Sequence, residues 1–295
     1  MENQNKVKRK IDKFRLGLWI FFILVIITLG VWQSVLLGGN KTLQVSVLNI
    51  GQGDSIYIKA PNGNEMIIDG GPDQKLLSEL GSVMPFFDKS VDVIVVTNPD
   101  KDHYAGFIDM LDRYSVGKLI ESGTISSTPT YHAFEEKVKE KGIERIIAQR
   151  GMKVVLDEKR EVYLEILFPN RDVSSESSND GSIVAKLVYG NTCMMLQGDS
   201  TAAVEQEVLI KENKESLKCE LLKVGHHGSR TSSLPEYIKA VSSETAIISL
   251  GKDNRYGHPH KEVLETLENQ NIKILRTDIE GRITFVSDGK NWERK

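Results

Sequence analysis

The longest uncharged stretch of the chain is the feature that most limits what it can fold into. Residues 16–37 contain no charged side chain, whereas residues 1–15 carry six basic and two acidic side chains. A helix of that length, rising about 1.5 Å per residue, crosses the roughly 30 Å hydrocarbon core of a bilayer. Such a helix satisfies every backbone polar group inside lipid. The sequence therefore predicts a transmembrane anchor at residues 16–37 behind a basic tail at residues 1–15.

A cleaved signal peptide is the alternative to a retained anchor. The uncharged run is longer than the usual apolar region of about 7–15 residues, and no A-x-A cleavage site follows it. We therefore favour a single-pass anchor in the cell membrane. The basic tail predicts a cytoplasmic N-terminus and an extracytoplasmic position for everything after the anchor. Residues 38–42 are then a short linker into a domain at residues 43–295.

The charge of that domain limits how it binds a polyanion. Without the tail and anchor, the chain has 32 basic and 39 acidic residues, a net charge of −7. A domain that holds nucleic acid through bulk charge is basic. Any polyanionic substrate must therefore be held by a local patch or by bound metal.

The two cysteines, Cys193 and Cys219, show no C-x-x-C spacing. We interpret them as small, buried, apolar residues. A disulfide between them stays open as an alternative, because the pairing depends on coordinates.

The hydrophobic pattern predicts two mixed sheets. Strands at 42–50, 55–60 and 65–71 come first, with a hairpin turn at Asn62-Gly63, and strand–helix alternation follows. A second group of strands begins at 153 and again leads into alternation. Two such groups favour an α/β fold of four layers, with the helices outside. Residues 174–182 are predicted to be a loop, and the last two strands, 272–278 and 282–288, a hairpin.

Polar side chains gather where the predicted strands end. Asp100, Asp102 and His103 follow one strand, Asp199 another, and the pair His226-His227 a third. Carboxylates with imidazoles suit Mn²⁺, Zn²⁺ or iron, and the share of oxygen favours Mn²⁺. Two ions about 3.5–4 Å apart would stabilise an oxyanion leaving group.

Simpler roles remain open for several of these residues. Asp100 and Asp102 also fit the start of a helix, where carboxylates cap backbone N–H groups and face the helix dipole. Asp69 before two glycines fits a turn, and His258 and His260 fit the start of another helix. Serine-hydrolase and P-loop chemistry are excluded, because neither G-x-S-x-G nor G-x-x-x-x-G-K-[ST] occurs.

The order of motifs across residues 43–290 resembles that of the metallo-β-lactamase-fold hydrolase domain of the ComEC/Rec2 competence proteins. The motifs are LNIGQGDSIYIKAPNGNEMIIDGG, VIVVTNPDKDHYAGF, SNDGSIVAKLVYGNTCMMLQGDS, LLKVGHHGSRTS, YGHPHKEVLETL and RTDIEGRITFVSDG. The resemblance implies an αββα sandwich with a centre of one or two divalent ions, Mn²⁺ or Zn²⁺, at the shared edge of the sheets. It also implies hydrolase chemistry, which in the competence proteins is a presumed nuclease activity on incoming DNA.

The resemblance assigns roles by position. It implies metal ligands at Asn98, Asp100, Asp102, His103, Asp199 and His226, catalytic roles for Asp102, His227 and His260, and ligand-orienting roles for Asp54, Asp69 and Lys223. It also suggests that Lys223 and His260 contact a phosphate. The competence proteins usually have histidine where this chain has Asn98, and a neutral amide oxygen there weakens or remodels one metal position. Mn²⁺ tolerates that change better than Zn²⁺.

Three functional hypotheses follow. The first is an anchored, exported, metal-dependent phosphodiesterase or nuclease. The second is a hydrolase of a small ester, thioester or lactam, which the acidic net charge favours. The third is a non-catalytic module that holds one metal ion or none because of Asn98. The competence proteins carry a channel of many spans, and this chain has one predicted span, so it does not conduct DNA alone.

Overall fold

The computed structural model describes residues 2–37 and 42–295, and it divides the chain into two compact units, residues 1–40 and 41–295. The first unit is one helix, α1 (Glu2–Leu37). Its segment Arg15–Trp32 has a mean hydropathy of 2.2 and is, within the described ranges, the one helix long and apolar enough to cross a membrane. Most of the predicted linker, residues 38–41, lies outside the described residues.

The second unit contains two mixed sheets. The larger sheet has the strand order β15-β14-β1-β2-β3-β4-β5-β6, and the smaller has the order β13-β12-β11-β10-β9-β8-β7. The strands of the larger sheet are β1 (Leu43–Val47), β2 (Ile56–Lys59), β3 (Glu65–Ile68), β4 (Ser90–Val96), β5 (Ser115–Glu121), β6 (Glu144–Ile147), β14 (Ile283–Ser287) and β15 (Trp292–Arg294). Those of the smaller are β7 (Lys153–Asp157), β8 (Val162–Phe168), β9 (Val184–Tyr189), β10 (Thr192–Gln197), β11 (Leu221–Lys223), β12 (Thr245–Ile248) and β13 (Lys273–Arg276).

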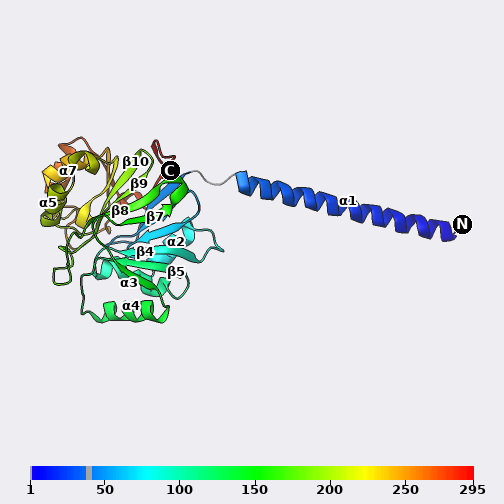
Figure 1. Ribbon diagram of the computed structural model, residues 1–295, viewed down its shortest axis with the longest axis horizontal. Coiled ribbons are helices and arrows are strands. Elements are labelled where there is room, and N and C mark those ends of the chain that lie inside the picture. Colours follow the sequence, from blue (N-terminus) through cyan, green and yellow to red (C-terminus); the bar gives the residue numbers. More distant parts are fainter. Residues whose placement is uncertain (1, 38–41) are drawn as a thin grey trace. The chain divides into compact units, whose positions relative to one another are not determined.

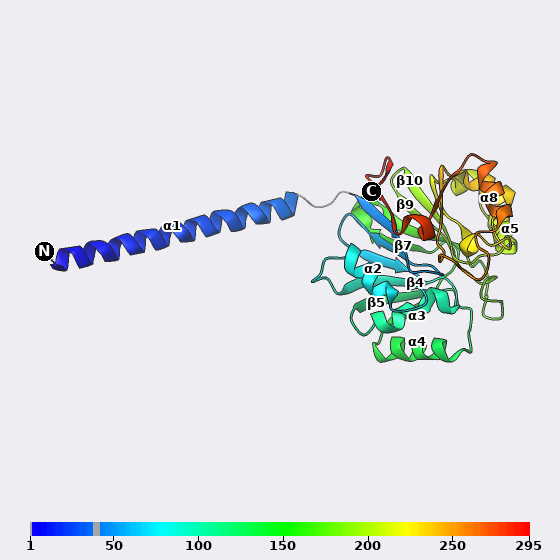
Figure 2. The same cartoon turned by 180° about the vertical axis from the view of Figure 1, so that it is seen from behind.

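Helices cover the outer face of each sheet. The larger sheet carries α2 (Lys75–Val83), α3 (Lys101–Met110) and α4 (Pro129–Glu140). The smaller carries α5 (Ala202–Lys211), α6 (Lys214–Leu217), α7 (Pro235–Val241) and α8 (Lys261–Glu268). Figures 1 and 2 show α3 and α4 on one flank and α5, α7 and α8 on the other. Short helices η1 (Glu158–Arg160), η2 (Gly225–Gly228) and α9 (Thr277–Glu280) lie in the connections. The predicted αββα sandwich is confirmed.

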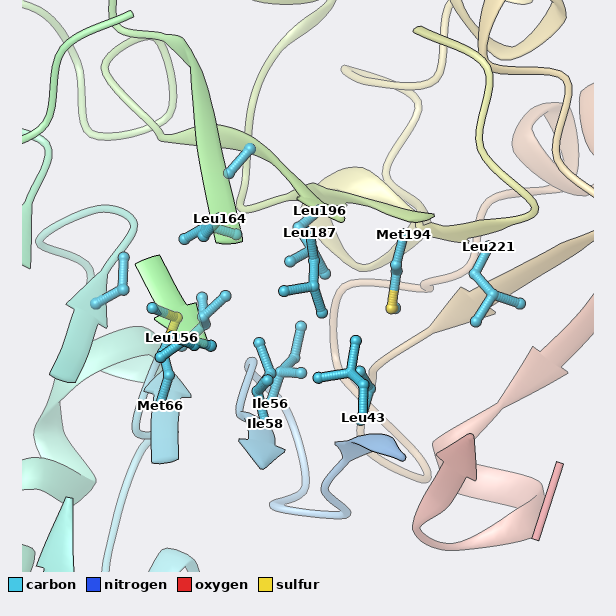
Figure 3. Packing of buried hydrophobic residues seen from close by; sticks show 14 of the residues in the cluster. Leu43, Ile56, Ile58, Met66, Leu156, Leu164, Leu187, Met194, Leu196 and Leu221 are labelled. Atoms are coloured by element: carbon cyan, nitrogen blue, oxygen red, sulfur yellow. The ribbon is translucent and has the colours of Figure 1, made fainter. Parts of the chain in front are cut away.

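Burial follows this layering, with three clusters of apolar side chains. The central cluster lies between the sheets, where side chains such as Ile58 and Met66 from one sheet face Leu164 and Leu196 from the other (Figure 3). The other two clusters lie under the helices on each outer face. Strands covered on both faces have nearly continuous apolar runs, which explains why VIVV and TCMMLQ lack alternation.

Two local expectations from the sequence were wrong. Strands β13 and β14 do not form a hairpin: β13 pairs with β12 in one sheet and β14 with β1 in the other. Cys193 and Cys219 do not remain unpaired but form a disulfide with a Cα–Cα distance of 5.1 Å. They meet because β10 and β11 are neighbouring parallel strands, with Met194 opposite Leu221.

Strand direction gives the larger sheet two distinct edges. β1, β3, β4 and β5 all run the same way, because β1 and β3 are both antiparallel to β2 and the other pairs are parallel. We call the edge where these four strands end the carboxyl edge, and the edge where they begin the amino edge. The parallel strands β10, β11 and β12 of the smaller sheet likewise end together.

Candidate metal centre

Carboxylates and imidazoles converge where the carboxyl ends of the two sheets meet. Asp54 follows β1, Asp69 follows β3, and Asp102 and His103 lie in the first turn of α3, directly after β4. Asp199 follows β10. Short connections after parallel strands place side chains at this edge, where α/β folds commonly bind ligands.

Two overlapping sets of side chains have the spacing of metal ligands. The candidate ligand atoms of Asp102, His103 and His227 lie within 4.8 Å of one another, and so do those of Asp54, His103 and Asp199. His103 Nε2 is 3.1 Å from Asp199 Oδ2, and His227 Nε2 is 3.6 Å from Asp199 Oδ1. Three carboxylates and two imidazoles therefore share one small volume.

The polar atoms at its centre have no hydrogen-bond partners. Among the described residues, Asp54 Oδ1, Asp199 Oδ1, His103 Nε2 and His227 Nε2 are buried and accept or donate no hydrogen bond. Buried polar atoms normally form hydrogen bonds, whereas these four have only ion-pair contacts, such as the 3.1 Å from His103 Nε2 to Asp199 Oδ2, and so require an explanation. Oxygen and imidazole nitrogen are the donor set of Mn²⁺ and Zn²⁺. The residues present thus fit a divalent ion.

Asp69 holds the ring of His103. Its Oδ2 accepts from His103 Nδ1 at 2.8 Å and from Thr97 Oγ1 at 2.7 Å, while its Oδ1 accepts from the Thr97 backbone N–H at 2.8 Å. This pattern keeps the proton on Nδ1 and directs Nε2 toward Asp199. Burial lowers the pKa of His103, but Asp199 and Asp69 outweigh it and hold that pKa well above its usual value.

His227 is held in a similar way. Its Nδ1 donates to the carbonyl oxygen of Ser249 at 2.9 Å and lies 3.4 Å from Asp54 Oδ1. Burial lowers the pKa of His227, but the charges of Asp199 and Asp54 outweigh that effect and raise the pKa to about 10. Asp54 is also paired with Lys223, whose Nζ lies 2.6 Å from Asp54 Oδ2. The suggestion that Lys223 contacts a phosphate is wrong, because the residue is 0% exposed.

The two adjacent histidines point to different places. His226 and His227 both have left-handed backbones, with φ of 47° and 54°. That conformation costs a non-glycine residue about 1–2 kcal/mol and commonly occurs at functional sites. His227 Nε2 lies in the cluster, whereas His226 donates or accepts at Nδ1 with Thr231 and has its Nε2 3.8 Å from Asp199 Oδ2.

The structure gives Asn98 and Asp100 local partners. The Oδ1 of Asn98, the atom that the sequence offered as a ligand, accepts from the backbone N–H of Asp100 at 2.8 Å. Asn98 is fully buried, and its Nδ2 has no partner among the described residues. Asp100 Oδ2 accepts from Ser178 at 2.8 Å, which ties the predicted loop 174–182 to the centre.

His258, rather than His260, borders the centre. A cavity of about 150 Å³ opens above the ligand atoms, lined by Gln52, Asp100, Asp102, Asp199, His226, His227, Tyr256 and His258. His260 instead accepts from the backbone N–H of Arg230 at its Nδ1, 3.1 Å away, directly before α8. Its ring centroid lies 4.9 Å from that of His258, so His260 supports a residue of the cavity wall.

A wider groove of about 720 Å³ shares Gln52, Asp102 and Tyr256 with that cavity. Its walls carry three cations, Lys75, Lys101 and Arg255. The guanidinium of Arg255 lies 5.2 Å from the ring centroid of Tyr256, which in turn stacks on His258 with centroids 5.6 Å apart. The groove is also lined by Asp73, Asp102 and Asp253, so its three cations are matched by three carboxylates.

The sequence analysis did not identify two residues that hold neighbouring parts of the candidate metal centre in place. Glu205 on α5 is 0% exposed and accepts from the backbone N–H groups of Ser233 and Leu234 and from the side chain of Gln197. It therefore joins the end of β10 to the loop after the histidine pair. The signal available was a glutamate on the apolar face of a predicted helix. Tyr256 was missed because loop residues have no periodicity.

Comparisons with known proteins agree with the fold. A model of the metallo-beta-lactamase superfamily matches residues 48–252. ComE operon protein 3 of Bacillus subtilis is 32% identical over 82% of this chain and 33% of its own length. Competence protein ComA of Neisseria gonorrhoeae is 28% identical over 86% of this chain and 35% of its own. The chain thus spans about a third of the length of these relatives.

Solved structures align with parts of this chain at low sequence identity. A long form of RNase Z from yeast aligns with a TM-score of 0.45 and 11% identity, over 74% of this chain and 39% of that one. The Rm3 metallo-beta-lactamase aligns with a TM-score of 0.39 and 15% identity, over 60% and 76%. Because the superfamily model matches more than half of the chain, the chain belongs to the metallo-β-lactamase superfamily.

Proposed function

We propose that this protein is a membrane-anchored, metal-dependent phosphodiesterase that acts on a nucleic-acid strand outside the cytoplasmic membrane. The observation that carries the proposal is the cluster of four buried atoms of Asp54, His103, Asp199 and His227 that make no hydrogen bond to any described residue, next to a cavity that Asp199 and His227 line. That cavity adjoins a groove whose walls carry Lys75, Lys101 and Arg255 together with Asp73, Asp102 and Asp253. The names of the relatives, competence proteins, support a DNA substrate.

The side chains of the cluster would bind the metal. One or two divalent ions would be held by Asp102, His103, His227, Asp199 and Asp54. The share of carboxylates among these residues favours Mn²⁺. A bound ion supplies a Lewis acid that polarises a phosphoryl oxygen and stabilises the leaving oxygen.

The remaining groups hold and orient the reacting parts. Asp69 keeps the proton on His103 Nδ1, and the carbonyl of Ser249 keeps the proton on His227 Nδ1. Each hydrogen bond leaves the opposite nitrogen free to bind metal. Lys101 and Arg255 would contact phosphates on either side of the scissile one, and Tyr256 would stack against a base.

The proposed anchor places this chemistry outside the cell. The basic residues of the tail lie at the N-terminal end of α1, before its uncharged run, which favours a cytoplasmic N-terminus. Protease treatment of intact spheroplasts tests this orientation. Digestion of residues 41–295 from outside supports it, and protection of that segment until lysis refutes it.

Residues 41–295 incubated with Mn²⁺ or Zn²⁺ test the activity. The substrates are single-stranded DNA, a chromogenic phosphodiester and a chromogenic lactam. We expect metal-dependent cleavage of the first two, lost in Asp102→Ala and retained in Asp112→Asn, an exposed carboxylate paired with Lys137 on the helical flank. Cleavage of the lactam alone would favour the small-molecule hydrolase. Metal binding below one ion per chain, without turnover, would favour the non-catalytic module.

A further inference from the structure

The two most exposed aromatic side chains of residues 42–295 are neighbours in one turn. Phe86 is 90% exposed and Phe87 is 87% exposed. The turn is closed by a hydrogen bond from the backbone N–H of Asp88 to the carbonyl oxygen of Pro85, 2.9 Å long. Lys89 follows, with its Nζ 5.8 Å from the ring centroid of Phe86. Adjacent exposed phenylalanines next to a lysine are typical of segments that enter a membrane interface.

The register of the larger sheet places this turn at the amino edge. Gln44 of β1 is opposite Lys59, Lys59 is opposite Glu65, and one residue further along these strands Met66 is opposite Val93. Ser90, the first residue of β4, is therefore level with the residue that precedes Leu43, and the phenylalanine turn lies directly beyond it. Three strand spacings of about 4.8 Å separate β4 from β1, or roughly 14 Å.

The same edge is where the chain arrives from the proposed anchor. Residues 38–42 separate the uncharged run from Leu43. A segment of that length spans at most about 20 Å when fully extended. Covalent reach therefore keeps the start of β1, and with it the phenylalanine turn, close to the bilayer surface. The short connection on this side of the domain therefore makes lipid the surface nearest to the two rings.

We propose that Phe86 and Phe87 insert into the lipid interface and hold the domain on the outer surface of the membrane by its amino edge. The inference rests on the proposed anchor and is independent of metal chemistry. Weak binding of the two rings to lipid is sufficient to hold the domain on the membrane, because a short tether gives the domain an effective concentration at the bilayer in the millimolar range.

This contact would orient the metal centre. The centre lies at the carboxyl edge, and β4 alone, Ser90–Val96, separates the two edges by about 23 Å at 3.3 Å per residue. With the amino edge on the lipid, the cavity opens away from the bilayer, toward a strand that approaches from outside. The proposed contact would therefore keep the groove free of lipid.

A tryptophan introduced into the turn tests the contact directly, with the parent domain as the control for Trp292. Residues 41–295 form a compact unit and contain one tryptophan, Trp292. The variant Phe87→Trp is titrated with vesicles of phosphatidylcholine and phosphatidylglycerol up to millimolar lipid, with and without brominated acyl chains. We expect its emission to shift to shorter wavelength and to be quenched by the brominated lipid, whereas the parent domain shows neither change.

Paired variants assign the binding to this turn. Phe86→Ser with Phe87→Ser should weaken vesicle co-flotation at least about tenfold. Ile125→Ser, which removes a 73% exposed side chain after the end of β5, should leave it unchanged. Unaltered emission of Phe87→Trp at millimolar lipid, or equal binding by both serine variants, overturns the proposal. A change of oligomeric state in the double variant without a change in flotation would instead assign the turn to contact with a second copy. Metal affinity, measured in the same variants, should stay at the parent value.

Discussion

Replacing Asp69 by asparagine tests whether the orientation of His103 controls metal binding. Asp69 has a φ of 60°, a left-handed conformation that asparagine also adopts readily, so the backbone need not change. The new amide can take two orientations. If its NH₂ group faces His103 Nδ1, two donors meet, and the imidazole proton must move to Nε2, the nitrogen proposed to bind metal.

The other orientation is also unfavourable. If the amide oxygen faces His103, the NH₂ group faces the backbone N–H of Thr97, which then loses its acceptor at a cost of about 1–3 kcal/mol. Partners of this kind typically contribute 10–100-fold to metal affinity. We therefore expect Asp69→Asn to weaken Mn²⁺ or Zn²⁺ binding by about 10–100-fold, equivalent to about 1.4–2.8 kcal/mol.

The assay is competition for metal with a chromophoric chelator at constant pH. The matched control is Asp92→Asn, which removes the same charge at the amino edge. Asp92 Oδ2 accepts from the backbone N–H of Glu65 at 2.7 Å, and a flipped amide still offers an oxygen there. The control should retain parent affinity. If Asp69→Asn, correctly folded, binds metal within about twofold of the parent, this account of His103 is refuted.

Three further predictions concern stability. Glu205→Ala removes a buried acceptor of two backbone N–H groups and should lower the free energy of unfolding in urea by about 3–5 kcal/mol. Glu207→Ala, which removes a half-buried carboxylate paired with Arg171, should cost at most about 1 kcal/mol, and equal losses would contradict the network. Mn²⁺ at 100 times its Kd should stabilise residues 41–295 by about 2.7 kcal/mol and raise Tm by about 5–10 °C. Neither Asp199→Ala nor the parent domain in chelator should show this rise. A parent Tm that does not change with Mn²⁺ would argue against the metal centre. Replacing Cys193 and Cys219 by serine removes a disulfide with a sequence separation of 26 and should lower the free energy of unfolding by about 3–4 kcal/mol. A decrease below about 1 kcal/mol would show that the disulfide contributes little to stability.

Local pattern determined the layers and most of the candidate ligands. Apolar runs such as VIVV can be buried only inside a sheet covered on both faces, so the order of strands and helices predicts the sandwich. The pattern placed Asp102, His103 and Asp199 at strand ends, but only the family resemblance implied that these ends, which belong to two different sheets, meet. The asparagine at position 98 was visible in the sequence, and the structure adds that its Oδ1 bonds to the backbone of Asp100.

Tertiary structure alone decided which atoms face one another. The resemblance gave the metal-ligand role to His226 and a catalytic role to His227, but adjacent imidazoles differ only through the backbone that carries them. In the structure both residues are left-handed, and the candidate ligand set contains His227, not His226. Lys223 was interpreted as a phosphate contact, but its strand, β11, is an inner strand of the smaller sheet and its ammonium group is paired with Asp54. The pairing of β13 and β14 with different sheets depends on contacts far apart in sequence, whereas hydrophobic period reports only which face of a strand is buried.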